Sequence, residues 1–290
     1  GGHFDISYNT ITYNNSTNGS SPGGIWGDHN SGTISHNTIA YNKGSGGYGG
    51  GIFSYFVGGT ISHNFITNNT ALSGAGIFCT GQDATPLITN NVIVNNAASD
   101  NGGGLYCVDQ ANATLVNNTI VNNEAAYGAG IYCGVNSSPS ITNCILYGNK
   151  VSAGGNAGNQ VYLNDELSDP DFYFCDIQGG KDDFGLNGNF FTGDYVEIIM
   201  DDPQFGAPTT GTGTSYDGLS AKWNLLMSSP CIDQGNPVGN YPPTDIGNNN
   251  RIRGERIDIG AYEYFDPTGI KDNKQLLTVS IYPNPFNSYT

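Results

Sequence analysis

A ten-residue pattern recurs six times in the first half of the chain at a nearly constant spacing. Its clearest copy is TISHNFITNN, from Thr60 to Asn69, and the other copies begin at Asp5, Thr33, Leu87, Thr114 and Ser140. Successive copies start 28, 27, 27, 27 and 26 residues apart. Self-similarity at a period of about 20–50 residues indicates stacked repeats, each one a small structural unit.

The aligned copies give four columns, two of apolar residues and two of asparagine. Short β-forming runs that each end in a bend favour strands over helices. Asparagine tolerates the left-handed backbone of a bend, and amides stacked at the ~4.8 Å strand spacing can bond to one another. Only a stack of coils buries the apolar edge of each coil, so the repeat predicts an all-β parallel β-helix, a solenoid, with all four columns facing inward. The columns are Ile6, Ile34, Ile61, Ile88, Leu115 and Ile141; Asn9, Asn37, Asn64, Asn91, Asn118 and Cys144; Ile11, Ile39, Ile66, Ile93, Ile120 and Leu146; and Asn14, Asn42, Asn69, Asn96, Asn123 and Asn149.

A second motif, glycines followed by an alternating triplet, lies between the ten-residue copies and predicts the third strand of each coil. Alternation along a strand places the first and third residues of the triplet inward and the middle residue outward. The middle residues form an aromatic column that we expect to be exposed: Trp26, Phe53, Phe78, Tyr106, Tyr132 and Tyr162. Such a column could bind a glycan through its ring faces, or the rings could stack on one another and only stiffen the sheet.

Residues 5–180 resemble right-handed parallel β-helix proteins with short coils, of the pectate-lyase-like superfamily, and the right-handed sense is implied by that resemblance. After Lys150 the motifs FYFCDIQGG, DDPQF, SPCIDQGNP and DIGAYEY follow in order. This series is similar to the C-terminal region of secreted bacterial β-helix proteins. It implies a seventh coil, a cap over the last coil formed by Trp223 to Tyr264, and export from the cell.

The final stretch contains YPNPFN, which resembles the opening of a type IX secretion system sorting domain. The resemblance implies the type IX machinery as a partner during export and an extracellular or bacterial cell-surface location. We therefore expect coils in residues 1–180, further coils and a cap in 181–265, a linker in 266–275 and the start of the sorting domain in 276–290.

Charge excludes two classes of partner. With nine basic residues against 25 acidic ones, the net charge of −16 argues against nucleic acid and against an anionic membrane surface. No apolar run approaches the ~20 residues of a membrane span, so membrane insertion is not expected.

Cysteine, histidine and acidic residues suggest further sites. Cys144 and Cys175 occupy one column in successive coils, within reach of a disulfide, although buried free thiols are the alternative for all six cysteines. His36 and His63 share another column and fit a polar outer face better than a metal site. No cofactor is expected, with calcium as the alternative, because oxygen-rich loops suit it. The candidate calcium ligands are Asp165, Glu166, Asp169 and Asp171, with the segment from Asp245 as a second loop.

The repeats lack the usual catalytic residues of this fold. No arginine precedes Arg251, Lys43 and Lys150 are expected in different columns four coils apart, and the acids of the coils share no strand column. We therefore predict no catalytic residues and a non-catalytic secreted or surface protein that acts as an adhesin, a matrix component or a glycan-binding stalk. The alternative is a carbohydrate-active enzyme, a polysaccharide lyase or glycoside hydrolase, whose groove lies partly in preceding coils.

The first coil carries an expectation about assembly. The sequence begins in mid-coil, which suggests a longer precursor, so the first complete rung, from Ile6 to Asn14, would present an unpaired strand edge. We expect that edge to be covered by residues outside this sequence or by self-association with a second copy.

Overall fold

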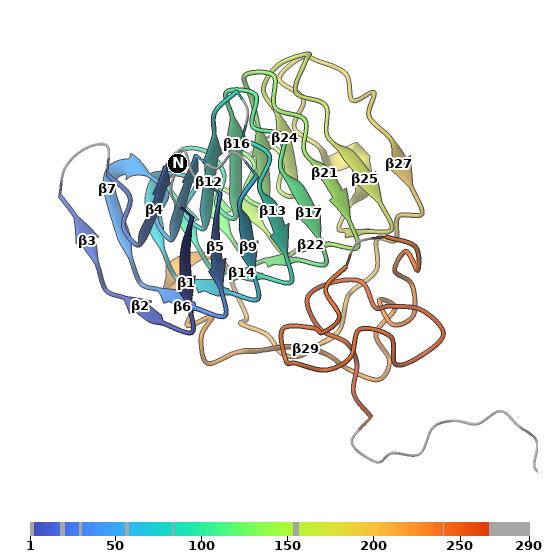
Figure 1. Ribbon diagram of the computed structural model, residues 1–290. Helices are drawn as coiled ribbons and strands as arrows, with labels where there is room; N and C mark the ends of the chain where they lie inside the picture. Colours follow the sequence, from blue (N-terminus) through green and yellow to red (C-terminus); the bar gives the residue numbers. More distant parts are fainter. Residues whose placement is uncertain are drawn as a thin grey trace, which may run out of the picture.

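The protein is an all-β solenoid in which successive coils stack strand upon strand (Figure 1). The structure, a computed structural model, describes residues 3–17, 21–28, 31–55, 58–82, 84–152, 157–239 and 241–266. The predicted sorting domain, and all but the first residue of the predicted linker, lie outside the described residues. Within the described residues no helix is long and apolar enough to cross a membrane.

The ten-residue repeat folds as predicted, because its two apolar columns form the inner faces of two parallel sheets, A and B. Ile61 pairs in register with Ile34 and Ile88 in sheet A, and Ile66 pairs with Ile39 and Ile93 in sheet B. Sheet A contains β1 (Phe4–Ser7), β5 (Gly32–Ser35), β9 (Thr60–Ser62), β13 (Leu87–Thr89), β17 (Thr114–Val116), β21 (Ser140–Thr142), β25 (Asp171–Tyr173) and β27 (Tyr195–Val196). Sheet B contains β2 (Thr10–Thr12), β6 (Thr38–Ala40), β10 (Phe65–Thr67), β14 (Val92–Val94), β18 (Thr119–Val121), β22 (Ile145–Tyr147) and β26 (Asp176–Ile177).

Each of the first six coils has four strands instead of the three predicted. The additional sheet, C, joins short strands that follow the second bend, and the glycine-led triplet is the fourth strand, in sheet D. Sheet C contains β3 (Asn15–Ser16), β7 (Lys43–Tyr48), β11 (Thr70–Ser73), β15 (Ala97–Ala98), β19 (Glu124–Ala125) and β23 (Lys150–Val151). Sheet D contains β4 (Ile25–Asp28), β8 (Ile52–Tyr55), β12 (Ile77–Thr80), β16 (Leu105–Val108), β20 (Ile131–Cys133) and β24 (Val161–Leu163).

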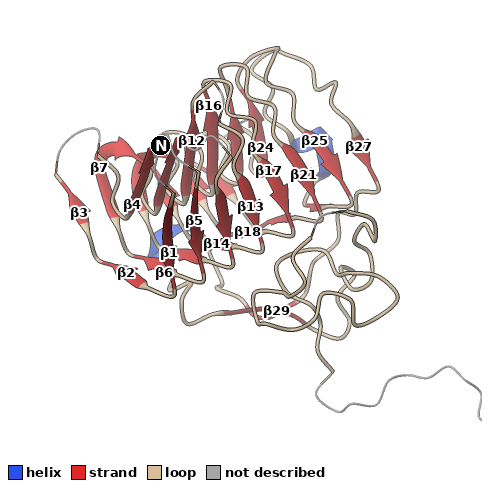
Figure 2. Cartoon of the chain, viewed as in Figure 1, coloured by secondary structure: helices blue, strands red, loops and turns tan. Residues whose placement is uncertain are grey.

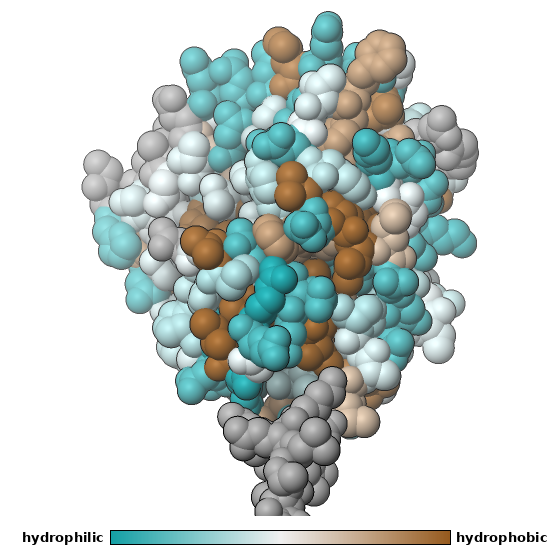
Figure 3. Space-filling view, turned by 90° about the vertical axis from the view of Figure 1, so that its right-hand side faces the viewer, coloured by the Kyte–Doolittle hydropathy of each residue, from teal (hydrophilic) through white to brown (hydrophobic). Residues whose placement is uncertain are grey.

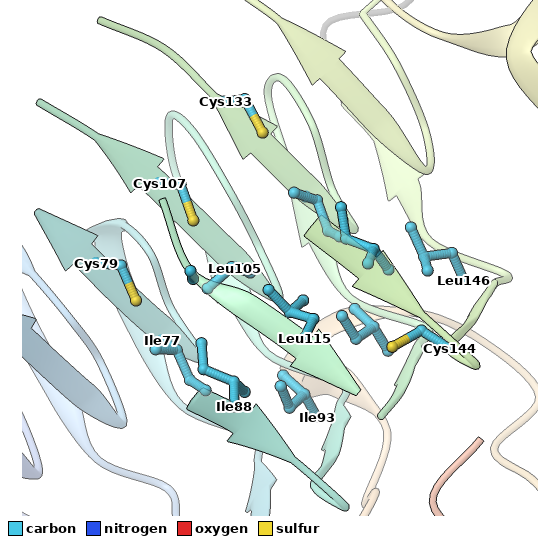
Figure 4. Close-up of a cluster of buried hydrophobic side chains, with 14 of the residues drawn as sticks. Ile77, Cys79, Ile88, Ile93, Leu105, Cys107, Leu115, Cys133, Cys144 and Leu146 are labelled. Atoms are coloured by element: carbon cyan, nitrogen blue, oxygen red, sulfur yellow. The ribbon is translucent and has the colours of Figure 1, made fainter. Parts of the chain in front are cut away.

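The interior is filled by columns of aliphatic side chains, with a row of cysteines in sheet D (Figure 4). Ile61, Ile66 and Ile77 are fully buried, as are Cys79 and its successors in the same column. The predicted inward columns are therefore confirmed for the interior coils, whereas Ile6 and Ile11 in the first described coil are half-buried.

The two asparagine columns form hydrogen-bonded ladders inside the bends. Asn64 Nδ2 donates to Asn91 Oδ1 at 3.0 Å and to the Ile34 carbonyl of the preceding coil at 2.9 Å, and its own N–H donates to the same Asn91 oxygen. The second ladder repeats this pattern from Asn14 to Asn149. The sequence predicts a left-handed backbone at the ladder asparagine. In the structure the left-handed residue is instead the one before it, such as His63 with φ of 54°.

The seventh coil predicted after Lys150 is present as β25 and β26, and β27 adds the start of a further turn. Phe172 packs here against Phe184, Phe191 and Tyr195, so rings fill the end of the interior. The short 3-10 helix η1 (Gly180–Asp183) connects β26 to this cluster. Figure 3 looks onto this side of the molecule, where apolar side chains show between hydrophilic ones.

The C-terminal strap, residues 203–239 and 241–265, lies along the outer face of sheet B (Figures 1 and 2). Its regular elements are the antiparallel strands β28 (Phe205–Ala207) and β29 (Lys222–Leu225) and the short 3-10 helix η2 (Gly213–Ser215). The prediction that Trp223 to Tyr264 caps the last coil is therefore wrong. The strap packs sideways because coils four to six turn apolar residues outward from sheet B, and these cluster with Trp223: Val92, Val94, Val121 and Ile145.

Bend side chains hold the strap along several coils. Tyr41 Oη in the second coil donates to Asp217 Oδ1 at 2.6 Å. Asn117 Nδ2 donates to the carbonyl oxygen of Asp258 at 3.1 Å, and Asn143 Oδ1 accepts the N–H of Asn236 at 2.7 Å. The outward residue of the first bend is thus asparagine where the strap passes in coils four to six, whereas Tyr8 and Tyr13 of the first coil are exposed.

Candidate functional site

The predicted aromatic column follows the outer face of sheet D, but its rings cover one another. Phe53 and Phe78 are stacked with ring centroids 5.0 Å apart, and Tyr132 and Tyr162 are stacked at 5.2 Å. Edge-on or tilted pairs complete the column: Trp26 with Phe53, Phe78 with Tyr106, and Tyr106 with Tyr132. This continuous contact between neighbouring rings is the arrangement expected if the column stiffens the sheet.

The prediction that all six rings are exposed is wrong. Trp26 in the first coil is 59 % exposed, whereas Phe78, Tyr132 and Tyr162 are at most 7 % exposed. Phe53 and Tyr106 are half-buried. Rings one strand spacing apart shield each other's faces, and further side chains shield them from the flank.

Two of these flanking side chains are tyrosines that the sequence analysis missed. Tyr48 lies 4.8 Å from the Phe78 ring, and Tyr127 lies 5.3 Å from the Tyr162 ring, each measured between centroids. Both tyrosines are about two-fifths exposed, at 40 % and 39 %. Each directly precedes a left-handed glycine, Gly49 or Gly128, that lies three residues before a strand of sheet D, and this position was the available signal. The aromatic surface is therefore defined as Trp26, Tyr48, Phe53, Phe78, Tyr106, Tyr127, Tyr132 and Tyr162.

The hydroxyls of Tyr106, Tyr132 and Tyr162 stay protonated at neutral pH. Burial raises the pKa of Tyr106 to about 12, with Tyr48 and the Asp100 carboxylate adding to the effect. Burial likewise raises the pKa values of Tyr132 and Tyr162. These hydroxyls can therefore donate hydrogen bonds, for example to the hydroxyl or ring oxygens of a bound molecule.

The four candidate calcium ligands do not converge. Asp165 accepts hydrogen bonds from the N–H of Val135 at 2.6 Å and from the Ser168 hydroxyl at 3.0 Å. Asp169 accepts the N–H of Thr192, and Asp171 accepts the N–H of Asp194, so these carboxylates tie neighbouring turns together. Among the described residues, no three acidic, histidine or cysteine side chains are grouped as metal ligands, Glu166 included.

The alternative calcium loop and the histidine column have structural contacts as well. Asp245 accepts the N–H groups of Asn249 and Glu263 within the strap. His36 and His63 are stacked with centroids 4.6 Å apart, and Tyr8 stacks on His36. The histidines thus form a column of outward bend residues, as the polar-face interpretation predicts.

All six cysteines are free and buried. Cys144 and Cys175 are neighbours in successive coils, as predicted, and the N–H of Cys144 donates to Cys175 Sγ at 3.4 Å. The structure thus has the buried free thiols of the alternative interpretation and no disulfide between these two residues. Cys144 stands at an asparagine position of the ladder, and its Sγ accepts the N–H of Asn118 as an asparagine oxygen does in the other coils.

The lysines of the coils lie in one column of sheet C, contrary to the sequence analysis. Lys43 pairs with Thr70, Thr70 with Ala97, Ala97 with Glu124, and Glu124 with Lys150. Four strand spacings separate the two lysines, which is about 19 Å. They are therefore too far apart to act on one bond of a substrate.

Buried carboxyl groups with raised pKa values lie beneath the strap and within it. Asp176 is fully buried, its Oδ2 accepts the Cys231 thiol at 3.2 Å, and burial raises its pKa to about 8. Burial also raises the pKa of Asp258, which is 3 % exposed, to about 6. Shifted carboxyl groups can mark catalytic acids, but these two face the interior of the protein.

The parallel register, the four-sheet coil and the asparagine ladders define the class of β-helix solenoid proteins. The family model described as "Right handed beta helix region" matches residues 1–177, and the chain belongs to this family. The match confirms the right-handed sense that the resemblance implied, and the family is compatible with surface or carbohydrate-related functions. No curated protein and no solved structure matches the chain.

Proposed function

We propose that this protein is a non-catalytic, secreted or cell-surface β-helix protein that binds glycan chains along the aromatic surface. The observation that carries the proposal is the row of rings on sheet D, in which Trp26, Tyr48 and Tyr127 remain 59 %, 40 % and 39 % exposed. Aromatic faces pack against the C–H faces of sugar rings, and a row that runs along the solenoid matches a linear polymer. An adhesive or matrix role would use the same surface.

The buried rings of this surface hold the exposed rings in place. Each exposed ring rests on a less exposed one, Tyr48 on Phe78 and Tyr127 on Tyr162, so its side chain is held before a ligand arrives. Preorganised aromatic side chains lose little conformational freedom on binding, and this favours affinity.

The buried carboxyl groups support a binding role over catalysis. Asp176, Asp258 and Glu263 have raised pKa values but are 0 %, 3 % and 4 % exposed. A catalytic acid must reach the bond that it protonates, so groups buried under or within the strap cannot serve a substrate in solution.

Export remains part of the proposal on sequence grounds. The motifs from CDIQGG to DIGAYEY and the terminal YPNPFN support passage through a type IX machinery and an extracellular or surface location. Acidic surface charge fits a partner without phosphate groups, which points to glycans and away from nucleic acid.

The test is a binding assay of the whole chain against insoluble and soluble polysaccharides, neutral and acidic. We expect retention on at least one polysaccharide, reduced about 10-fold or more in the triple variant Trp26→Ala, Tyr48→Ala, Tyr127→Ala. The matched control is Tyr8→Ala with Tyr13→Ala, because these tyrosines are 79 % and 74 % exposed but lie at bends outside sheet D.

The control variant should bind as the wild type does. Equal retention of the triple variant would overturn the aromatic surface as the binding site. New reducing ends or unsaturated products in the supernatant would overturn the non-catalytic assignment.

A further inference from the structure

The aromatic surface ends in an open pocket between sheet D and the turns that follow η1. Its volume is about 580 Å³, within the usual range for small-ligand sites. The side chains that line it include Tyr127, Tyr162, Asp182, Phe184, Asn187 and Asn189. We propose that this pocket binds one neutral sugar unit of the glycan, a deepening that rests on the proposed function.

The aromatic wall of the pocket is held in place from behind. Tyr127 and Tyr162 meet at an interplanar angle of 55°, with Tyr162 buried and Tyr127 39 % exposed. The exposed tyrosine thus presents ring surface at the pocket while its partner fixes it. A sugar that packs its C–H face on Tyr127 would point its hydroxyl groups toward the opposite, polar wall.

The polar wall is a tight turn with fixed amides. Asn187 has a left-handed backbone with φ of 48°, and its Nδ2 donates to the Asn164 carbonyl at 2.8 Å. The N–H of Asn189 donates to the Leu186 carbonyl at 2.7 Å, which closes the turn around Gly188. This wall therefore offers amide groups at constrained positions, and Asn187 Oδ1 is oriented by the bond that its Nδ2 makes.

Charge at the pocket favours a neutral sugar over a uronate. Asp182 is the ionisable carboxylate among the described lining residues, and no lining residue is basic. Lys181, its neighbour in sequence, places Nζ 5.7 Å from the centroid of the Tyr195 ring and does not line the pocket. A carboxylate accepts hydrogen bonds from two sugar hydroxyls, whereas the carboxylate of a uronate would be repelled.

The experiment compares neutral hexose trisaccharides with uronate trisaccharides by calorimetric titration of the whole chain. For the wild type we expect at least one neutral trisaccharide to bind and uronates to bind more weakly. Tyr127→Ala should weaken the affinity for the neutral trisaccharide about 10-fold or more. Asp182→Asn should weaken binding of the neutral ligand and strengthen binding of the uronate, because the amide no longer repels the uronate carboxylate. The preference for the neutral sugar over the uronate should therefore become smaller.

Two matched controls separate the pocket from the rest of the surface. Asp183→Asn changes an adjacent exposed carboxylate that does not line the pocket, and Tyr8→Ala removes a ring that is 79 % exposed at a bend outside sheet D. Both should bind trisaccharides as the wild type does. Unchanged melting temperatures of the pocket variants show that any loss is not a loss of folding.

The outcomes distinguish the two proposals. If Tyr127→Ala and Asp182→Asn bind like the wild type while Trp26→Ala or Tyr48→Ala weakens trisaccharide binding, the pocket inference is wrong and the aromatic surface stands. If uronates bind more tightly than neutral sugars, the assigned ligand class is wrong. If no polysaccharide or trisaccharide binds, the proposed function itself fails.

Discussion

Arg251 and Glu263 form an ion pair within the C-terminal strap, with Nη1 2.9 Å from Oε1 and both side chains buried. Arg251 Nη2 also donates to Asn90 Oδ1 on the bend before β14, and Glu263 Oε1 accepts the N–H of Asp258. One buried guanidinium thus joins two strap segments to the solenoid. Breaking such a pair leaves an unpaired buried group, which costs more than the pair itself contributes.

Arg251→Met should therefore destabilise the protein by about 3 kcal/mol, the lower end for a broken buried pair, because Glu263 can take up a proton. Burial already raises the pKa of Glu263 to about 8, which makes that uptake easy. Urea unfolding measures the loss. Arg253→Met is the matched control, because Arg253 is exposed and stacks on Phe265, and a loss as large as that of Arg251→Met would contradict the assignment.

The ladder predicts a gradient of stability along the solenoid. Asn91 donates to Asn118 Oδ1 and to the Ile61 carbonyl, and its Oδ1 accepts two hydrogen bonds from Asn64. Asn91→Ala leaves several buried groups unpaired and should cost about 3 kcal/mol or more. Asn9→Ala, at the exposed start of the ladder, should cost about 1 kcal/mol. Equal losses in thermal or urea unfolding would show that the ladder is not what holds the bends.

The ten-residue repeat predicted two of the four sheets of the solenoid. The columns of Ile61, Asn64, Ile66 and Asn69 recur in every copy, with Leu115, Cys144 and Leu146 as their departures. Nearly identical residues at one period can lie only in one register, so sheets A and B followed from the sequence. Sheet C did not, because strands such as Ala97–Ala98 are too short to show alternation.

The position of the strap and the exposure of the aromatic rings were not predicted, because both depend on tertiary contacts. Val92 and Val94 sit on both sides of the inward Ile93, and two outward valines were the sign that another segment covers sheet B. The exposure of the rings was mispredicted because Tyr48 and Tyr127 approach the column from sheet C and the loop that follows it. Alternation gives the direction of a side chain but not what lies on top of it.

Asp176 predicts how stability depends on pH. Its pKa is raised to about 8 in the folded protein, so between about pH 4 and 8 the folded state binds more protons than the unfolded state. Its contribution to stability therefore falls as pH rises through this window. Asp176→Asn should unfold at a higher urea concentration than the wild type at pH 8 and nearly the same one at pH 4. Asp5→Asn, far from the strap, is the control, and an unchanged pH profile in Asp176→Asn would contradict the account.

The thiols give a direct chemical test of the interior. All six cysteines are buried and free, and burial raises the pKa of the Cys133 thiol, so native protein should react slowly with alkylating reagents. After denaturation without a reductant, mass spectrometry should find six alkylated cysteines. Four alkylated cysteines, with Cys144 and Cys175 joined, would instead establish the disulfide.

Glycan binding at the aromatic surface is tested most directly by the fluorescence of Trp26. The chain has two tryptophans, Trp26 at 59 % exposure and Trp223 at 1 %, so quenching by acrylamide reports chiefly on Trp26. Titration with a bound polysaccharide should protect Trp26 from the quencher in a saturable way, and Trp26→Phe should abolish the protected signal. Unchanged quenching of Trp26 at saturating concentrations of a polysaccharide that the protein retains would contradict the account.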